Sequence, residues 1–203
     1  MTVLAPQPAA LVNFDLIKPK VDPTPFLAEI ARIDDPWGIA TGRQDKIKVQ
    51  REAKAIAIRG LRKSAIGERE RRDVHESRYT STARLFPYTT AFLESFAQEY
   101  GGELSRAKIV CLPAGHRVYP HIDRGEYYAL RDRFHLVLQG QQGSWLKAGE
   151  EQVEMQTGEL WRFDNKAVHE AYNGGNGDRI HFIFDLRPLG TNPSGTNVLL
   201  VAE

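Results

Sequence analysis

The stretch that decides the fold is "YPHIDRGEYYALRDRFHLVLQG", residues 119–140. His121 and Asp123 are two residues apart, so in an extended chain both side chains leave the backbone on the same face. The segment "RDRFHLVLQG", residues 131–140, then alternates basic and apolar side chains and predicts a strand with one polar and one apolar face. These polar groups either face solvent on a surface strand or converge on a ligand.

From Ser105 onward the chain consists of short apolar or alternating runs, separated by turn signals such as "PAG", "QGQQG" and "NGGNGD". Many short strands at close spacing are typical of an all-β sandwich or barrel. We expect strands over residues 107–112, 116–121, 132–139, 144–148, 151–155, 159–164, 168–172 and 179–187.

The first half of the chain indicates helices and connecting segments. Residues 25–34 and 87–100 place apolar side chains at helical spacing and are bounded by proline at the start and by Asp-Asp-Pro or Gly-Gly at the end. Residues 53–60 predict one further strand that precedes the β-rich half.

Residues 61–84 are polar and rich in charge, which predicts a loop. This loop is either a solvated connector or an Arg-rich lid over a site, and the arginines at 69, 71 and 72 either meet an acidic substrate or form a solvated charged run. We expect a single domain over residues 1–203. Its parts are an N-terminal arm (1–24), a helical and loop support (25–104), a β-rich catalytic core (105–188) and a C-terminal tail (189–203).

Composition narrows the class of protein. The 203 residues are 41% hydrophobic, and the formal net charge of +1 gives no electrostatic case for binding nucleic acid or an anionic membrane. The single cysteine, Cys111, excludes an intrachain disulfide and a cysteine-based zinc site, and we expect it in the core. The sequence has no apolar run long enough to span a membrane and no segment typical of a secretion signal. We therefore expect a soluble, cytoplasmic protein without nucleic-acid or membrane partners.

A third residue suited to metal binding, His169, follows in "FDNKAVHEAYN". Two imidazoles and one carboxylate on three corners of an octahedron form the facial triad of non-haem Fe(II) oxygenases, which leaves three positions open. The pair of His121 and Asp123 alone is weak evidence, because such a pair occurs by chance in β proteins. Together with His169 it predicts a site for Fe(2+), with room for a bidentate cosubstrate and dioxygen.

Ten residues after His169, Arg179 opens the segment "RIHFIFDLRP". The even-numbered residues of this segment are apolar and predict a core-facing side, whereas the other side carries Arg179, His181 and Asp185. A buried guanidinium needs an anion, and its planar fork of donors matches a carboxylate. The simplest anion that both chelates Fe(II) and ends in a free carboxylate is 2-oxoglutarate. His181 is expected to be a packed neighbour of the site.

Three segments resemble, in the same order, the motifs of the aspartyl/asparaginyl β-hydroxylase family of Fe(II)- and 2-oxoglutarate-dependent dioxygenases. They are "LPAGHRVYPHID", "RFHLVLQG" and "GELWRFDNKAVHEAYNGGNGDRIHFIFDLRP", and the resemblance covers about 80 residues from Lys108 to Pro188. It implies a mainly β fold with flanking α-helices, namely a double-stranded β-helix (jelly roll, cupin-like) with helices packed on one sheet.

The resemblance also implies roles for residues. The triad would ligate iron, and Arg179 and His135 would bind the distal carboxylate of 2-oxoglutarate. Arg133 matches a basic position near the cosubstrate or the substrate. A structural salt bridge for Arg133 and a core role for His135 remain alternatives. Some animal members carry glycine in place of the acidic ligand, whereas Asp123 keeps the triad complete.

The implied activity is the hydroxylation of an unactivated C–H bond, at the β-carbon of an Asp- or Asn-like amino acid that is free, carrier-bound or part of a peptide. Two other functions fit the same residues: a cupin-like metal-binding sensor, and a metalloenzyme that does not use 2-oxoglutarate. Tyr119, Tyr127 and Tyr128 flank the triad and either line a substrate pocket or pack in the core.

Overall fold

The computed structural model describes residues 11–38, 48–61 and 74–190. Within them, no helix is long and apolar enough to cross a membrane. The elements are, in chain order, β1 (Phe14–Lys18), α1 (Thr24–Ala31), η1 (Lys48–Gln50), β2 (Lys54–Leu61), β3 (Ser77–Tyr79), η4 (Ser81–Leu85), α2 (Pro87–Tyr100), β4 (Gly102–Leu112), β5 (Arg117–His121), α3 (Glu126–Ala129), β6 (Asp132–Gln139), β7 (Ser144–Ala148), β8 (Glu151–Val153), β9 (Leu160–Phe163), β10 (His169–Asn173) and β11 (Arg179–Pro188).

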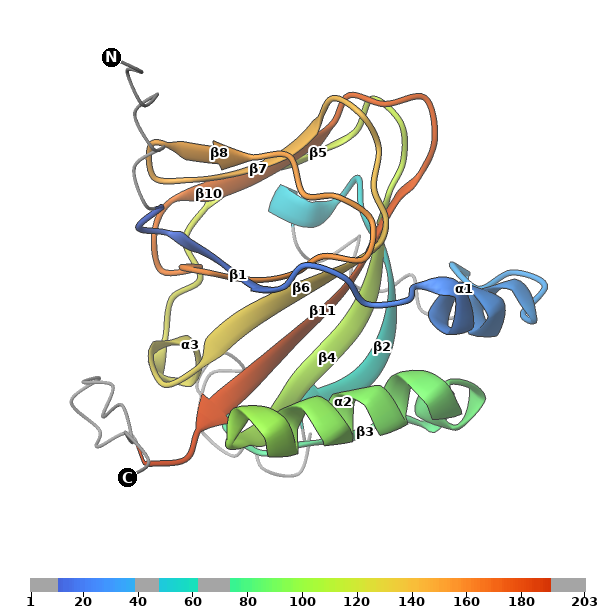
Figure 1. The fold of residues 1–203 in the computed structure, drawn as a ribbon, viewed down its shortest axis with the longest axis vertical. Coiled ribbons are helices and arrows are strands. Elements are labelled where there is room, and N and C mark those ends of the chain that lie inside the picture. Colours follow the sequence, from blue (N-terminus) through green and yellow to red (C-terminus); the bar gives the residue numbers. More distant parts are fainter. Residues whose placement is uncertain (1–10, 39–47, 62–73, 191–203) are drawn as a thin grey trace, which may run out of the picture.

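Two antiparallel sheets form a double-stranded β-helix. The larger sheet has seven strands in the order β1-β9-β6-β11-β4-β2-β3, and the smaller sheet has four in the order β5-β10-β7-β8. Figure 1 shows the smaller sheet above the larger one, with α2 lying across the outer face of the larger sheet. The expected fold, mainly β with flanking helices and of jelly-roll type, is confirmed.

The alternation of side chains gives the two central strands of the larger sheet, β6 and β11, one apolar and one polar face. On the apolar face, the ring centroid of Phe96 on α2 lies 5.3 Å from that of Phe134 and 5.6 Å from that of Phe184. These rings belong to the main hydrophobic core, between the helices and the larger sheet. A smaller cluster, which includes Leu146 and Phe163, fills the space between the two sheets. The polar residues of β6 and β11 therefore lie on the inner face, beside this smaller cluster.

Helix α2 has the bounds that the sequence predicts. Pro87 occupies its first turn, where a missing N–H costs no helical hydrogen bond. At its end, Gly101 adopts a φ of 68°, the left-handed conformation that glycine adopts without strain, and its N–H donates to the carbonyls of Ala97 and Gln98.

The N-terminal half contains more strands than expected. Within the arm, β1 pairs with β9 at the edge of the larger sheet, with Phe14 opposite Phe163. The segment 61–84 was expected to be a loop, but its described part contains β3 and the 3₁₀ helix η4. Both strands are short and pair with distant segments, so tertiary contact forms them rather than a local pattern.

Three of the expected features lie outside the described residues. They are the central part of the proposed lid (62–73) with Arg69, Arg71 and Arg72, the beginning of the arm (1–10), and most of the tail (191–203).

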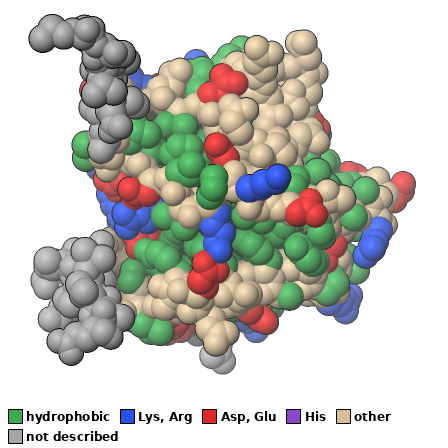
Figure 2. Space-filling model, in the orientation of Figure 1, with side chains coloured by type: hydrophobic (Ala, Val, Ile, Leu, Met, Phe, Trp, Pro, Cys, Tyr) green, Lys and Arg blue, Asp and Glu red, His purple; other side chains and the backbone are tan. Residues whose placement is uncertain are grey.

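Charge is distributed evenly over the visible face of the molecule. Figure 2 shows Lys and Arg side chains interspersed with Asp and Glu side chains on the face that carries α2, with no large area of one sign. This mixture agrees with the formal net charge of +1.

A buried carboxylate joins the two long helices. Glu29 on α1 is 3% exposed, and its Oε2 accepts hydrogen bonds from the backbone N–H of Thr89 at 3.0 Å and from Thr89 Oγ1 at 2.7 Å. Its Oε1 accepts from the backbone N–H of Tyr88. The first N–H groups of a helix have no partner within the helix, and an anion there also interacts favourably with the helix dipole. Glu29 therefore fixes α1 to the start of α2.

We predict that Glu29→Ala lowers the free energy of unfolding by about 1–3 kcal/mol, because buried N–H groups lose their acceptor. Glu99→Ala provides the control, since Glu99 lies on α2, the helix that Glu29 caps, and forms an exposed ion pair with Lys18. Such pairs contribute about 1 kcal/mol or less. Urea unfolding of both variants measures the difference. An equal loss in the two variants would contradict the capping role of Glu29.

Candidate metal centre

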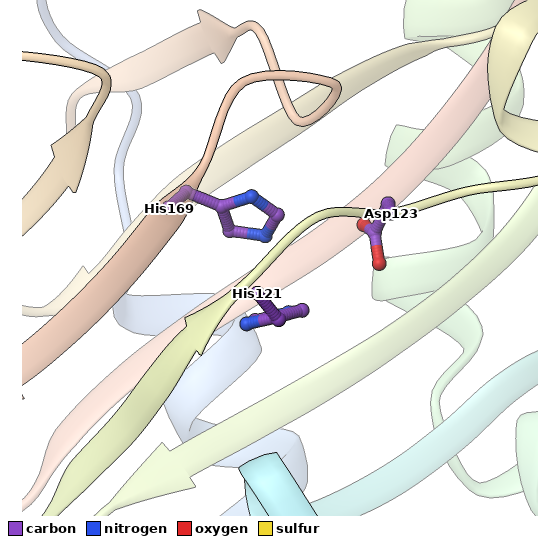
Figure 3. Close-up of side chains that lie close together, drawn as sticks. All are labelled: His121, Asp123 and His169. Carbon is purple, nitrogen blue, oxygen red and sulfur yellow. The ribbon is translucent and has the colours of Figure 1, made fainter.

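Three side chains meet between the two sheets, at the ends of neighbouring strands. His121 ends β5, Asp123 follows two residues later, and His169 begins β10, directly opposite His121 in the antiparallel pair. The two imidazole centroids are 4.2 Å apart, and one potential ligand atom from each of the three residues lies within 4.8 Å of the others. Figure 3 shows the three side chains gathered in one place. The structure thus brings the predicted ligands together.

Both imidazoles are oriented by the same local hydrogen bond. Nδ1 of His121 lies 2.7 Å from the carbonyl oxygen of Tyr119, and Nδ1 of His169 lies 3.0 Å from that of Ala167. A carbonyl oxygen only accepts hydrogen bonds, so Nδ1 carries a proton and Nε2 is the nitrogen that can bind a metal. Burial lowers the pKa of His169 to about 4, with a further contribution from His121, so His169 is neutral at neutral pH.

The carboxylate of Asp123 is held in its anionic form. Burial raises its pKa, but the Arg133 guanidinium, the Asn165 amide and the two imidazoles outweigh that effect and lower the pKa to about 2. Oδ2 accepts a hydrogen bond from Nη1 of Arg133 and another, 3.0 Å long, from Nδ2 of Asn165. Two imidazoles and one carboxylate fit a divalent first-row ion such as Fe(II), with coordination positions left open.

A cavity adjoins His121 and His169, and its volume is about 760 Å³ when the space open to solvent at its mouth is counted. Its wall contains Arg179, which is 7% exposed and has no hydrogen bond or ion pair with any described residue. Burial lowers the pKa of Arg179 to about 10, so the guanidinium remains charged at neutral pH. A buried cation is costly without an anionic partner, so this end of the cavity is suited to an anion.

His135 lines the same cavity, and its Nδ1 lies 3.3 Å from Nδ1 of His181. Burial lowers the pKa of both imidazoles well below the usual range, and the nearby charge of Arg179 adds to this effect. Both rings are therefore neutral, and His181 packs behind His135 as the sequence indicates.

Arg133, also in the cavity wall, is already paired. Its Nε donates to Oδ1 of Asp185 at 2.8 Å and its Nη2 donates to Oδ2 of Asp185 at 3.0 Å, while Nη1 donates to Asp123. The salt-bridge alternative that the sequence left open for Arg133 is therefore present. Its predicted place beside the cosubstrate stays a prediction.

Two residues of the site were not predicted from the sequence as part of it. Asn165 is 1% exposed and Asp185 is 3% exposed, and both contact the Asp123–Arg133 pair through their side chains. A polar residue within a strongly apolar strand was the available signal for Asp185, whereas Asn165 follows Asp164 in a turn. Asp164 stabilises this turn, because its Oδ1 accepts a hydrogen bond from the backbone N–H of Lys166 at 3.0 Å.

A model of the aspartyl/asparaginyl β-hydroxylase family matches residues 68–188, more than half of the 203 residues. The chain belongs to this family. No curated protein sequence matches the chain.

Two solved structures share the fold of this β-hydroxylase family member. One is a prolyl hydroxylase from Trichoplax adhaerens in complex with a hypoxia inducible factor peptide fragment, with a TM-score of 0.56 and 16% identity over 86% of this chain and 83% of that one. The other is an oxidoreductase of the 2OG-Fe(II) oxygenase family from Burkholderia pseudomallei, with a TM-score of 0.52 and 12% identity over 91% of this chain and 89% of that one. At these identities the similarity shows the fold alone.

We predict that His169→Ala weakens Fe(II) binding by more than about 100-fold, since even residues that only support a metal ligand commonly contribute 10- to 100-fold. His116→Ala is the matched control, because Nδ1 of His116 lies 3.0 Å from the carbonyl oxygen of Ala114 in the same local arrangement, but on the surface. Anaerobic calorimetry with Fe(II) measures both affinities. Equal affinities in the two variants would exclude His169 as a ligand.

Proposed function

We propose that the chain is an Fe(II)- and 2-oxoglutarate-dependent dioxygenase that hydroxylates an unactivated C–H bond. The observation that carries this proposal is that the cavity beside the cluster of His121, Asp123 and His169 also contains a buried Arg179 that lacks an anion among the described residues. Family membership supports the same function.

In this proposal the triad would hold Fe(II) through the two imidazoles and the carboxylate. Fe(II) bound there would supply the chemistry by which one oxygen atom of dioxygen enters succinate, formed with carbon dioxide from 2-oxoglutarate, and the other enters the substrate C–H bond as hydroxyl. The protein supplies orientation, open positions and a water-poor environment.

Arg179 and His135 would bind the distal carboxylate of 2-oxoglutarate. The guanidinium offers two parallel donors that match a carboxylate, and a neutral imidazole donates one more hydrogen bond from its protonated nitrogen. Because Arg179 is buried, its attraction for an anion is weakly screened by solvent. Val110, Leu112 and Leu146 would form apolar walls around the carbon chain of 2-oxoglutarate.

A second groove continues from the cavity, and Lys108, Arg133 and Ile183 line both. The groove contains further cations, among them Arg59 and Arg78, and among the described residues its acidic member is Asp185, which is already paired with Arg133. This excess of positive charge favours an acidic substrate. We infer that the substrate is an Asp- or Asn-like amino acid, free, carrier-bound or in a peptide, hydroxylated at its β-carbon.

The shape of the groove is compatible with a peptide. It is open to solvent and measures about 1480 Å³, counting that open space. A structural neighbour was solved with a peptide fragment bound, which makes peptides a reasonable first choice for assays.

We predict that Fe(II) and 2-oxoglutarate, mixed anaerobically with the protein, give a weak visible charge-transfer absorption band. The band should be lost in His169→Ala, and Arg179→Ala should raise the apparent Kd of 2-oxoglutarate by about tenfold or more, because a charge-assisted bond contributes about 1.5–3 kcal/mol. Arg187→Ala, at an exposed arginine paired with Glu103, should leave the band and the Kd unchanged. A metal-binding sensor, or an enzyme that does not use 2-oxoglutarate, would show no band in the wild type.

Arg78 allows the expected preference for an acidic substrate to be tested. Arg78 is exposed and lines the groove, so Arg78→Glu should lower kcat/KM for an acidic substrate about threefold to tenfold, as expected for reversing one exposed charge. Lys20→Glu reverses an exposed charge outside the groove lining and serves as the control. Succinate formation, measured with matched acidic and neutral peptides, gives the result. Faster turnover of the neutral peptide in the wild type would contradict the acidic substrate.

A further inference from the structure

A chain of ionic contacts leads from the middle of β11 to the proposed iron ligand. Asp185 on β11 lies directly opposite Arg133 on β6 in the antiparallel pair, and its two carboxylate oxygens accept from Nε and Nη2 of Arg133 at 2.8 and 3.0 Å. The remaining terminal nitrogen, Nη1, donates to Oδ2 of Asp123. All three side chains are at most 10% exposed.

The fork between Arg133 and Asp185 fixes the direction of the guanidinium plane. A guanidinium bound by two parallel hydrogen bonds cannot rotate without breaking both of them. Asp185 is itself held, because Oδ2 also accepts a hydrogen bond of 3.1 Å from the hydroxyl of Tyr127, which is fully buried. Nη1 is therefore directed at Asp123 by contacts that do not involve Asp123.

The contacts of Asp123 are asymmetric. Oδ2 accepts from both Arg133 and Asn165, whereas no described residue donates a hydrogen bond to Oδ1. The position of Asn165 is itself fixed, because its backbone carbonyl oxygen accepts a hydrogen bond of 3.1 Å from the backbone N–H of Asp123. A carboxylate can bind a metal through one oxygen or through two. Here one oxygen is occupied by donors and the other is available.

We propose that Asp185, acting through Arg133, and Asn165 are positioning residues that restrict Asp123 to binding the metal through Oδ1 alone. This inference rests on the proposed function, in which three positions around iron must stay open. If Asp123 bound the metal through both oxygens, the three residues would fill four of its six coordination positions. Two positions would remain, too few for a bidentate cosubstrate and dioxygen together.

The charges of Asp123, Arg133 and Asp185 also support a role for Asp185. Asp123, Arg133 and Asp185 together carry one net negative charge, so the metal meets the charge of a single carboxylate. If Asn replaced Asp185, the buried guanidinium would be balanced by Asp123 alone, and that pair would have no net charge to offset the charge of the metal. Asp185 therefore preserves the donor strength of a ligand that it does not touch.

The experiment is a double-mutant cycle that uses Co(II) as a spectroscopic probe in the full-length protein. Asp185→Asn should weaken Co(II) binding by about 10- to 100-fold and should change the visible spectrum of the bound ion, which reports its coordination number. In an Arg133→Met background, Asp185→Asn should have no further effect, because Asp185 then has no route to Asp123.

Two further variants keep the test decisive. Asp132→Asn is the matched control, because Asp132 is an acidic residue next to Arg133 on β6 that accepts a hydrogen bond from Tyr100 and lies near Arg162. It should change neither affinity nor spectrum. If Asp185→Asn does not fold, Asn165→Ala removes the other donor to Oδ2 and should change the spectrum in the same way.

Unchanged Co(II) affinity and spectrum in Asp185→Asn would overturn the proposal, and so would an equal loss in the presence and absence of Arg133. If Asp185→Asn does not fold, an unchanged spectrum in Asn165→Ala overturns it instead. These readouts need no 2-oxoglutarate, so they stand apart from the test of the oxygenase function. A wild type that binds Co(II) but gives no band with Fe(II) and 2-oxoglutarate would contradict the function and leave the positioning result interpretable.

Discussion

The structure depends on the alternation of side chains along β6 and β11, the central strands of the larger sheet. One face of these strands must be apolar, because α1 and α2 pack on it through rings such as Phe96 and Phe134. The opposite face is equally buried but carries Arg133, His135 and Arg179. Buried polar groups destabilise a fold unless they have partners, so every charge on this inner face requires an explanation.

The two arginines of the inner face have different explanations. Arg133 is paired with two carboxylates of the protein, whereas Arg179 has no such partner among the described residues. Arg133 is part of the folded framework, whereas the environment of Arg179 is suited to an anionic ligand. His135 and His181 need no anionic partner, because burial lowers the pKa of both imidazoles and keeps them neutral. The same strands therefore provide both the support of the proposed iron ligand and the end of the cavity that is suited to an anion.

Much of this arrangement could be predicted from the sequence because it follows local periodicity. The strands 132–139 and 144–148 and the helix 87–100 have the predicted bounds, since an alternating or helical pattern marks each of them. β1 could not be predicted, because only Phe14 of its residues is buried and the strand exists by pairing with β9. Likewise, the roles of Asn165 and Asp185 depend on three distant segments meeting at Asp123, which no single stretch of sequence reveals.

The direct opposition of His121 and His169 in the β5–β10 pair has a consequence for the smaller sheet. The register of this pair shifts immediately beyond His169, so the irregularity lies next to the two imidazoles. Sliding one strand by a single residue would turn one imidazole to the other side of the sheet. A metal that binds both rings would select the native alignment over its neighbours, since any ligand stabilises the state it binds. The ion would then also stabilise the pairing of β5 with β10 in the smaller sheet.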